Sequence, residues 1–217
     1  MILTAIITIV AAYLIGSINF AVIFSKLFSK ADVREAGSGN AGATNVLRTS
    51  GVLPGVLTFI CDLLKGVVSS AIGLFMFSYL YTKTGSPAYV PIYGAYACGV
   101  ACMIGHVFPV FFDFRGGKGV AVGAGVFFVC SPYAILIGLA VFVIFVLVTK
   151  IVSLASLAGT VATVVLGIVF NTKGDDVLLL PQIVMALSMG VIIFLKHTSN
   201  IKRIISGEEK KINSRYF

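Results

Sequence analysis

Long apolar segments run through most of the chain and constrain its fold more than any other feature. Of the 217 residues, 59% are hydrophobic and only 11% are charged, whereas a soluble domain carries about 25% charged residues. In hydrocarbon, backbone N–H and C=O groups must be paired within each segment, and an α-helix achieves this. The strict alternation that indicates an outer-membrane barrel is absent from the sequence. We therefore predict an all-α, polytopic integral membrane helix bundle.

Seven apolar segments are predicted to be transmembrane helices, because a crossing needs roughly 20 apolar residues. They lie near 2–25, 53–81, 88–111, 119–131, 133–149, 153–171 and 177–196. The fourth is short for a crossing, at about 18 Å for a rise of 1.5 Å per residue. No basic region precedes the first segment and no cleavage site follows it, so we expect a retained helix. We expect a single domain over 1–217, with a basic cytoplasmic tail over 196–217.

The basic residues predict the orientation of this bundle. With the amino terminus outside, thirteen lysines and arginines fall on the cytoplasmic side and only Lys83 and Lys173 fall outside. This agrees with the positive-inside bias and places the carboxyl terminus in the cytoplasm. The net charge of +8 follows mostly from the same asymmetry. Because the basic residues are spread over short loops, we expect no nucleic-acid partner, but we expect the tail to contact anionic membrane lipid.

A first polar loop interrupts the apolar sequence and continues to Arg48. It reads Gly37-Ser38-Gly39-Asn40-Ala41-Gly42-Ala43-Thr44-Asn45. Its glycines let backbone N–H groups approach an anion, and a helix starting after it adds partial positive charge. Ser38, Asn40 and Asn45 supply hydrogen bonds, and Arg48 can fork onto a phosphate. We predict a phosphate-binding loop, with a plain flexible turn as the alternative, since the glycine spacing alone is a weak signal.

A second glycine-rich loop follows the third apolar segment. It carries two cations and three glycines within five residues, namely Arg115, Gly116, Gly117, Lys118 and Gly119. It is not a Walker A loop, because no Ser or Thr follows the lysine. Unobstructed N–H groups before a helix again favour phosphate binding. His106 lies near the end of the third segment, and contact with a ligand or a capping role at the interface are both open.

Polar residues inside or beside other segments are further candidates. Asp62 and Lys65 are three residues apart and can face each other on one helix. We expect an ion pair directed toward the loops, since an isolated charge in the membrane is costly. Ser153 and Ser156 share a helix face near the cytoplasmic end of the sixth segment, where packing and ligand contact are both open.

The tail supplies the last candidates. On a helix, His197 and Asn200 lie on one side, together with Arg203 or Ile204. A histidine that leaves the membrane beside two phosphate-binding loops is suited to orienting or deprotonating a substrate.

Together these motifs resemble the PlsY family of bacterial acyl-phosphate:glycerol-3-phosphate acyltransferases. The similarity runs essentially the whole length, and the two glycine-rich motifs are the specific part of it. Three residues depart from the family pattern. Arg115 stands where lysine is more common, Val122 replaces a usual threonine, and Thr198 follows His197 where an arginine is common.

The resemblance implies an enzyme of the bacterial plasma membrane with seven helices and an active site facing the cytoplasm. It would transfer a fatty acyl group from acyl phosphate to the 1-hydroxyl of sn-glycerol 3-phosphate. The products would be lysophosphatidate and phosphate, in the first step of phospholipid biosynthesis, with no cofactor and no metal. The catalytic residues would be Ser38, Arg48, Lys118, His197 and Asn200. Substrate binding would involve Gly37, Gly39, Asn40, Asn45, Lys65, His106, Arg115, Gly116, Gly117, Gly119, Ser153 and Ser156.

The chemistry of that reaction suits these residues, because both substrates are phosphates that need cations and N–H donors. The acyl phosphate is already activated, so no covalent nucleophile is required. The proton acceptor is open between His197 and a substrate phosphate. A transporter of a phosphorylated metabolite is the alternative from another class. It predicts paired repeats with broken helices, and the sequence shows no convincing repeat.

Overall fold

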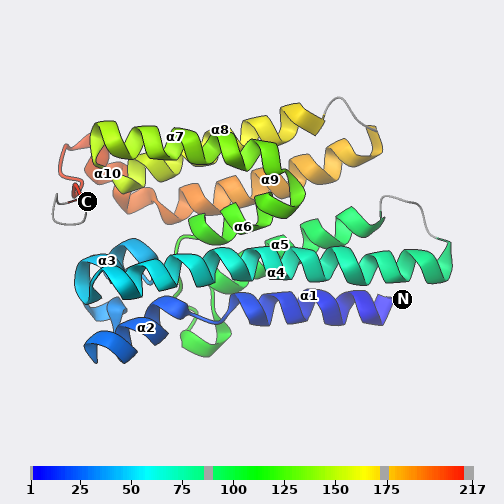
Figure 1. Cartoon of the computed structure of the whole chain (residues 1–217), viewed down its shortest axis with the longest axis horizontal. Coiled ribbons are helices and arrows are strands. Elements are labelled where there is room, and N and C mark those ends of the chain that lie inside the picture. Colours follow the sequence, from blue (N-terminus) through cyan, green and yellow to red (C-terminus); the bar gives the residue numbers. More distant parts are fainter. Residues whose placement is uncertain (1, 86–89, 172–175, 213–217) are drawn as a thin grey trace. The chain divides into compact units, whose positions relative to one another are not determined.

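The computed structural model describes residues 2–85, 90–171 and 176–212. Within these ranges the chain forms α-helices and short 3₁₀ turns and no strand, which confirms the all-α prediction. Lys173 and Arg215, which the charge count used, lie outside the described residues. The chain divides into two compact units, Met1–Cys130 and Ser131–Phe217, and each is described by itself (Figure 1).

The described residues of the first unit form six α-helices and both predicted phosphate loops. Helix α4 packs against α5 and α6, and α1 packs against α5 and α4. The shorter helices α2 and α3 pack on each other and on α4 (Figure 1). In chain order the elements are α1 (Ile2–Gly16), α2 (Phe20–Ser29), η1 (Val33–Glu35), α3 (Ala43–Ser50), α4 (Val52–Thr84), α5 (Val90–Val107), η2 (Val110–Phe112) and α6 (Val120–Cys130).

In the second unit, the residues that the structure describes form three long helices and one short one. Helix α8 packs against both α7 and α9, and α10 contacts α8 and α9. The elements are α7 (Pro132–Thr149), α8 (Val152–Asn171), α9 (Asp176–Lys196) and α10 (Thr198–Ile205). Helix α7 begins at Pro132, which is favourable in a first turn because the N–H that proline lacks would have no helical partner there.

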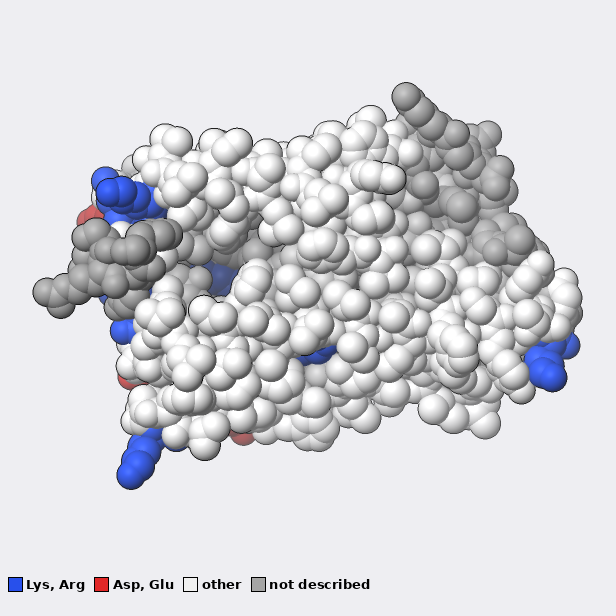
Figure 2. All heavy atoms as spheres, viewed as in Figure 1, with Lys and Arg blue, Asp and Glu red and all other residues white. Residues whose placement is uncertain are grey.

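Among the described residues, six stretches are long and apolar enough to cross a membrane. They begin at Ile2, Val52, Val90, Pro132, Val152 and Leu179, close to six of the seven predicted segments. The seventh, α6, has only 11 residues. Apolar side chains cover the sides of the helices, as expected of lipid-facing surfaces. Figure 2 shows this surface almost free of charged atoms, with Lys and Arg visible mainly near its ends.

The first predicted span differs from expectation, because the helix over 2–25 is broken into α1 and α2. Asn19 caps α2 by accepting a hydrogen bond from the Val22 N–H at 3.3 Å. The break leaves the Ile18 carbonyl without a helical partner, and Lys65 Nζ donates to it at 2.8 Å. At the break Gly16 lies directly against the backbone of Cys102 in α5, a contact that a side chain would prevent. Apolar periodicity does not reveal such a break, since polar groups from other helices compensate it.

Candidate active site

The first loop is organised around the side chain of Asn45, at the start of α3. The Asn45 amide nitrogen donates to the carbonyls of Val33, Ala36 and Asn40 at 2.9–3.1 Å. Its oxygen accepts a hydrogen bond from the Ser38 N–H at 2.9 Å. Asn45 is only 2% exposed. This predicted substrate-binding residue therefore holds the loop from within, and its amide faces the loop backbone.

Two glycines set the outer course of this loop. Gly37 and Gly39 have φ values of +65° and +70°, in the left-handed region that favours glycine. A side chain at Gly37 would also collide with the amide of Asn45. Ser38, between them, is exposed, whereas Arg48 is partly buried on α3. The predicted helix after the loop is present, because α3 begins at Ala43.

The second loop follows the end of α5 and makes a tight turn before its glycines. Asp113 and Phe114 both have positive φ, +55° and +56°, a conformation that non-glycine residues adopt only when surrounding contacts impose it. The Phe114 N–H donates to the Pro109 carbonyl at 3.0 Å. The chain then reaches Gly117, whose N–H donates to the His106 carbonyl at 3.2 Å, and α6 begins at Val120 as predicted.

The two loops are in direct contact. Gly117 lies so close to the His106 ring and the Ala41 carbonyl that a side chain at Gly117 would overlap both. Ala41 belongs to the first loop, so the absence of a side chain at Gly117 lets one backbone approach the other. The structure thus brings together the motifs that the sequence places about 75 residues apart.

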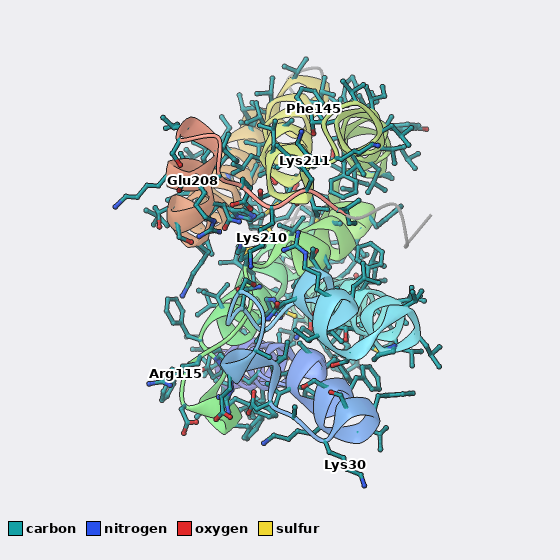
Figure 3. All side chains as sticks on the ribbon, turned by 90° about the vertical axis from the view of Figure 1, so that its left-hand side faces the viewer. Lys30, Arg115, Phe145, Glu208, Lys210 and Lys211 are labelled. Atoms are coloured by element: carbon teal, nitrogen blue, oxygen red, sulfur yellow. The ribbon has the colours of Figure 1, made fainter. Side chains whose placement is uncertain are left out.

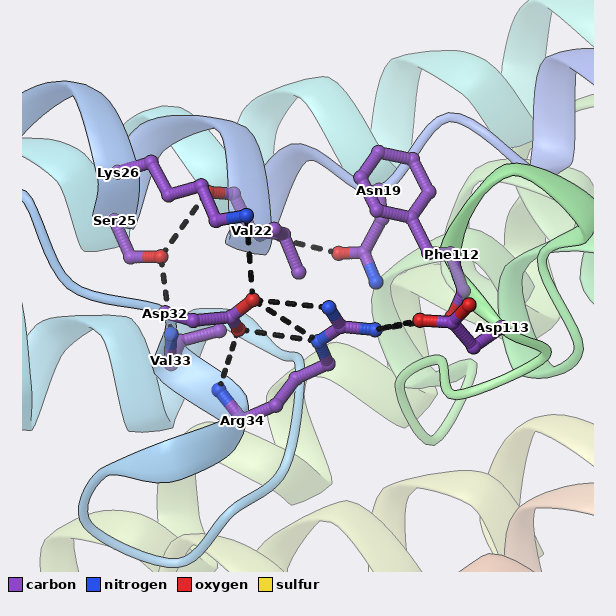
Figure 4. A network of polar contacts seen from close by, with 9 residues as sticks. All are labelled: Asn19, Val22, Ser25, Lys26, Asp32, Val33, Arg34, Phe112 and Asp113. Atoms are coloured by element: carbon purple, nitrogen blue, oxygen red, sulfur yellow. Dashed lines mark hydrogen bonds and ion pairs between the residues drawn. The ribbon is translucent and has the colours of Figure 1, made fainter.

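A charged cluster forms a second link between the loops (Figure 4). Asp32 accepts hydrogen bonds from Arg34 Nε at 3.1 Å and Nη2 at 2.9 Å, and Lys26 Nζ lies 3.5 Å from the same carboxylate. Arg34 Nη1 donates to the Phe112 carbonyl at 3.0 Å and contacts Asp113 at 3.4 Å. The hydrogen bond from Arg34 lowers the pKa of Asp32 to about 2, so this carboxylate is ionised at neutral pH.

Beneath the second loop, three titratable side chains are buried together. Lys65 Nζ is 2.9 Å from Asp62 Oδ1, which confirms the predicted pairing of these two residues. His106 Nδ1 lies 3.6 Å from the same oxygen. All three side chains are at most 5% exposed. Because Gly117 packs on the His106 ring, His106 lies between the second loop and the Asp62–Lys65 ion pair.

In the second unit, several predicted residues converge on a carboxylate that the sequence did not single out. Ser153 donates to Glu209 Oε1 at 2.8 Å and Asn200 donates to the same oxygen at 2.6 Å. Arg203 Nε donates to Glu209 Oε2 at 2.6 Å. Burial alone would raise the pKa of Glu209, but these hydrogen bonds outweigh it and the pKa is lowered. The prediction that Asn200 and Arg203 lie on one side of a helix is confirmed.

His197 and Ser156 are also placed by local hydrogen bonds. The His197 ring Nδ1 is 2.8 Å from the Ile193 carbonyl. A carbonyl only accepts, so the neutral ring carries its proton on Nδ1 and has Nε2 as its acceptor. Ser156 donates to the Val152 carbonyl of its own helix at 2.9 Å.

Figure 3 shows exposed charged side chains in each unit. In the first unit, Lys30 and Arg115 are both exposed and point outward there. In the second, Glu208, Lys210 and Lys211 lie on the segment after α10. This segment is held in place, because the Ile212 N–H donates to the Lys150 carbonyl at 2.8 Å.

Three residues with a clear part in this architecture were missed from the sequence: Asp32, Arg34 and Glu209. The first two could have been noticed, because an Asp-x-Arg sequence immediately precedes the first glycine-rich loop. Glu209 carries no such signal, since its partners on α8 and α10 become neighbours only in the folded unit.

Comparison with known proteins agrees with these motifs. A family model described as glycerol-3-phosphate acyltransferase matches residues 6–207. The chain is 41% identical to glycerol-3-phosphate acyltransferase 2 of Bacillus anthracis, over 95% of this chain and 98% of the relative. It is 39% identical to glycerol-3-phosphate acyltransferase of Finegoldia magna, over 94% of this chain and 93% of the relative.

Solved structures show the same fold. The glycerol 3-phosphate form of the integral membrane enzyme PlsY matches with a TM-score of 0.80 and 36% identity, covering 97% of this chain and 96% of that chain. Its lysophosphatidic acid form matches with a TM-score of 0.79 and 34% identity, covering 98% and 97%. The described helices therefore belong to an integral, multi-pass membrane fold.

Proposed function

The chain belongs to the glycerol-3-phosphate acyltransferase family and is an acyltransferase that forms lysophosphatidic acid, and we propose that its two glycine-rich loops bind the reacting phosphates. The observation that carries this proposal is the contact between the loops, where Gly117 packs against the Ala41 carbonyl. The contact brings the hydrogen-bond donors of both loops to one place, where they can bind neighbouring phosphates. One loop is followed by Arg48 and the other contains Lys118.

Each loop then has a distinct part in binding. In the first, the Ser38 hydroxyl, the Gly37 N–H and the Asn40 amide supply hydrogen-bond donors. Gly39, whose N–H donates to the Ala36 carbonyl, shapes the turn, and Asn45 keeps the loop in place. In the second, Gly116 and Gly119 supply N–H groups, and Arg115 and Lys118 supply charge. Gly117, whose own N–H donates to the His106 carbonyl, allows the close approach of the two loops. Multiple donors and cations are what a phosphate dianion needs to replace its lost hydration. Lys65 and His106 support the second loop from beneath through the contact between His106 and Gly117.

The reaction is acyl transfer from an acyl phosphate. The 1-hydroxyl oxygen of glycerol 3-phosphate attacks the acyl carbon and forms the new ester bond. The bond between that carbon and the bridging phosphate oxygen breaks, and inorganic phosphate leaves with the electron pair. Arg48 and Lys118 stabilise the negative charge that develops on the carbonyl oxygen and on the departing phosphate.

The hydroxyl proton has two possible acceptors within this scheme. One is Nε2 of His197, which is the acceptor nitrogen of the neutral ring because Nδ1 faces the Ile193 carbonyl. The other is an oxygen of a substrate phosphate. Replacing His197 with Gln separates them, since a phosphate acceptor would leave the pH profile of kcat unchanged. Asn200, Ser153 and Ser156 are further proposed substrate-binding residues.

The proposal places the enzyme in the bacterial plasma membrane as a single domain over 1–217, with the active site facing the cytoplasm. With α6 counted as a crossing, the chain crosses the membrane seven times, and α6 follows directly from the second loop. Seven crossings put the termini on opposite sides, with the amino terminus outside. The basic residues support this orientation through the positive-inside bias, and the basic tail would contact anionic lipid.

Activity with defined donors tests the reaction. Purified protein is supplied with labelled glycerol 3-phosphate and with palmitoyl phosphate, palmitoyl-CoA or no donor. We expect lysophosphatidate only with palmitoyl phosphate, and we expect Lys118→Ala to abolish turnover or to raise the KM for glycerol 3-phosphate sharply. Product with palmitoyl-CoA alone would refute the donor assignment. Uptake of label into sealed vesicles without any product would indicate transport instead.

The shared location of the loops has its own test. Single cysteines replacing Ser38 and Lys118 are labelled with a membrane-impermeant thiol reagent, in closed and in opened vesicles. Both positions should react from the cytoplasmic side. Reaction from opposite sides of the membrane would refute the proposed site.

A further inference from the structure

Arg34 lies between the two glycine-rich loops and is bound to both. It precedes the first loop directly, in η1, and its guanidinium reaches the turn before the second loop (Figure 4). Its side chain is 21% exposed, so its hydrogen bonds are partly shielded from water. Like the packing of Gly117 on Ala41, its hydrogen bond to the Phe112 carbonyl joins these two segments.

The guanidinium is held in a fixed orientation on the first-loop side. Asp32 engages Nε and Nη2 with its two oxygens, a bidentate geometry that fixes the plane of the guanidinium. Asp32 also accepts the backbone N–H of Arg34 at 2.9 Å, which fixes the local backbone. The remaining nitrogen, Nη1, is thereby directed away from Asp32.

On the second-loop side, Nη1 meets a strained turn. It donates to the Phe112 carbonyl at 3.0 Å, directly before the left-handed residues Asp113 and Phe114. That conformation is unfavourable for residues other than glycine and persists only where neighbours impose it. The same carbonyl accepts the Arg115 N–H at 3.0 Å. A bond from Arg34 to this carbonyl therefore stabilises the turn that leads into Gly116, Gly117 and Lys118.

We propose that Arg34 is a positioning residue for the acyl transfer. It holds the second glycine-rich loop against the first, so that both loops keep the relative position in which they bind their phosphates. It touches no substrate and acts through the Phe112 carbonyl. The inference rests on the proposed function, in which the two loops bind the reacting phosphates. A lysine at this position cannot replace the arginine, because a single ammonium cannot hold Asp32 in a bidentate pair and reach Phe112 at once.

The test compares three variants in the full-length protein with palmitoyl phosphate as donor. Arg34→Gln and Arg34→Lys should raise the KM for glycerol 3-phosphate by roughly tenfold to a hundredfold, the loss expected for a hydrogen bond to a charged group. Thermal unfolding should stay close to that of the wild type for Arg34→Lys, which keeps a pair with Asp32. Lys26→Gln is the matched control, because Lys26 pairs with Asp32 but has no contact with the second loop. It should leave the KM unchanged.

Non-additivity and chemical rescue distinguish positioning from general stability. If Arg34 acts through the second loop, Arg34→Gln should add little to the defect of Gly117→Ala, which already displaces that loop. Millimolar guanidinium should partly restore Arg34→Ala. A folded Arg34→Lys with the wild-type KM, or full additivity with Gly117→Ala, would overturn the proposal. So would failure of both Arg34→Gln and Arg34→Lys to fold, since the residue would then be purely structural.

The positioning role of Arg34 and the proposed function can fail separately. If Lys118→Ala is inactive but Arg34→Gln is normal, only the positioning role of Arg34 is refuted. If Lys118→Ala has normal activity, the assignment of the loops to phosphate binding is refuted as well.

Discussion

Replacing Asn45 tests whether the first loop depends on one buried amide. Asn45→Ala removes four hydrogen bonds, three to carbonyls and one from the Ser38 N–H. A typical hydrogen bond contributes about 1 kcal/mol net, and the loop carbonyls nearest the surface recover some of the loss through water. We therefore expect a cost of about 3 kcal/mol to order the loop, or roughly a hundredfold in kcat/KM.

The aspartate variant sharpens this prediction, because its shape is nearly that of asparagine. In Asn45→Asp the carboxylate can still accept from the Ser38 N–H, but its other oxygen faces three carbonyl oxygens. Like partial charges then oppose each other, so Asn45→Asp should be at least as impaired as Asn45→Ala. Thr49→Ala is the control, since its hydroxyl bonds to the Asn45 carbonyl and the Ser50 hydroxyl, both in its own helix. It should stay within about twofold of the wild type.

The assay is acyl transfer from palmitoyl phosphate with glycerol 3-phosphate varied, beside thermal unfolding of each variant. A loop defect should lower kcat/KM far more than it lowers the unfolding temperature. Near-normal activity of Asn45→Asp would show that the three carbonyl contacts do not hold the loop, and the reasoning would be wrong.

Three further outcomes follow from other contacts. Removing either partner of the buried pair, by Asp62→Asn or Lys65→Met, should cost about 3–5 kcal/mol in unfolding, whereas the double variant should recover much of it; single variants as stable as the wild type would contradict the pair. Glu209→Gln should cost about 2 kcal/mol and expose the tail to protease. The hydrogen bonds lower the pKa of Glu209, although burial acts to raise it. The stabilisation from Glu209 is therefore full above the unfolded pKa of about 4.3 and is lost as the pH falls through the folded pKa. A tail that stays protected from protease below the folded pKa would argue against this role of Glu209. Gly37→Ala should impair activity more than Gly39→Ala, since both need positive φ but only Gly37 also meets a buried side chain; equal loss would argue against that contact.

Much of the fold could be predicted from the sequence, because lipid leaves few alternatives to helices. In the described part of the chain, six apolar spans lie close to the expected boundaries, and both loops lead into helices as expected. The break at Gly16–Asn19 was missed. It depends on Lys65, 47 residues later along the chain from Ile18, and no local pattern carries that information.

The candidate site was predictable in its motifs but less so in the division of labour among their residues. Asn45 was expected to touch substrate, whereas its amide is occupied by the loop. The sequence indicates which residues are polar, but it does not indicate which of them face inward. The links made by Arg34 and Glu209 were missed for the same reason, since each depends on partners that only folding brings near.

The interruption of the first span has a consequence for how the protein is made. To the machinery that inserts membrane proteins, residues 2–29 form one candidate apolar span, and they leave the ribosome before α4 does. The Ile18 carbonyl is therefore an unpaired acceptor until α4 packs against the first span. The Lys65 ammonium, which is paired with Asp62, then donates to it. A continuous apolar helix in place of residues 2–29 would insert equally well. It would have no unpaired carbonyl for the Lys65 ammonium, so the defect would affect only the later association of the helices.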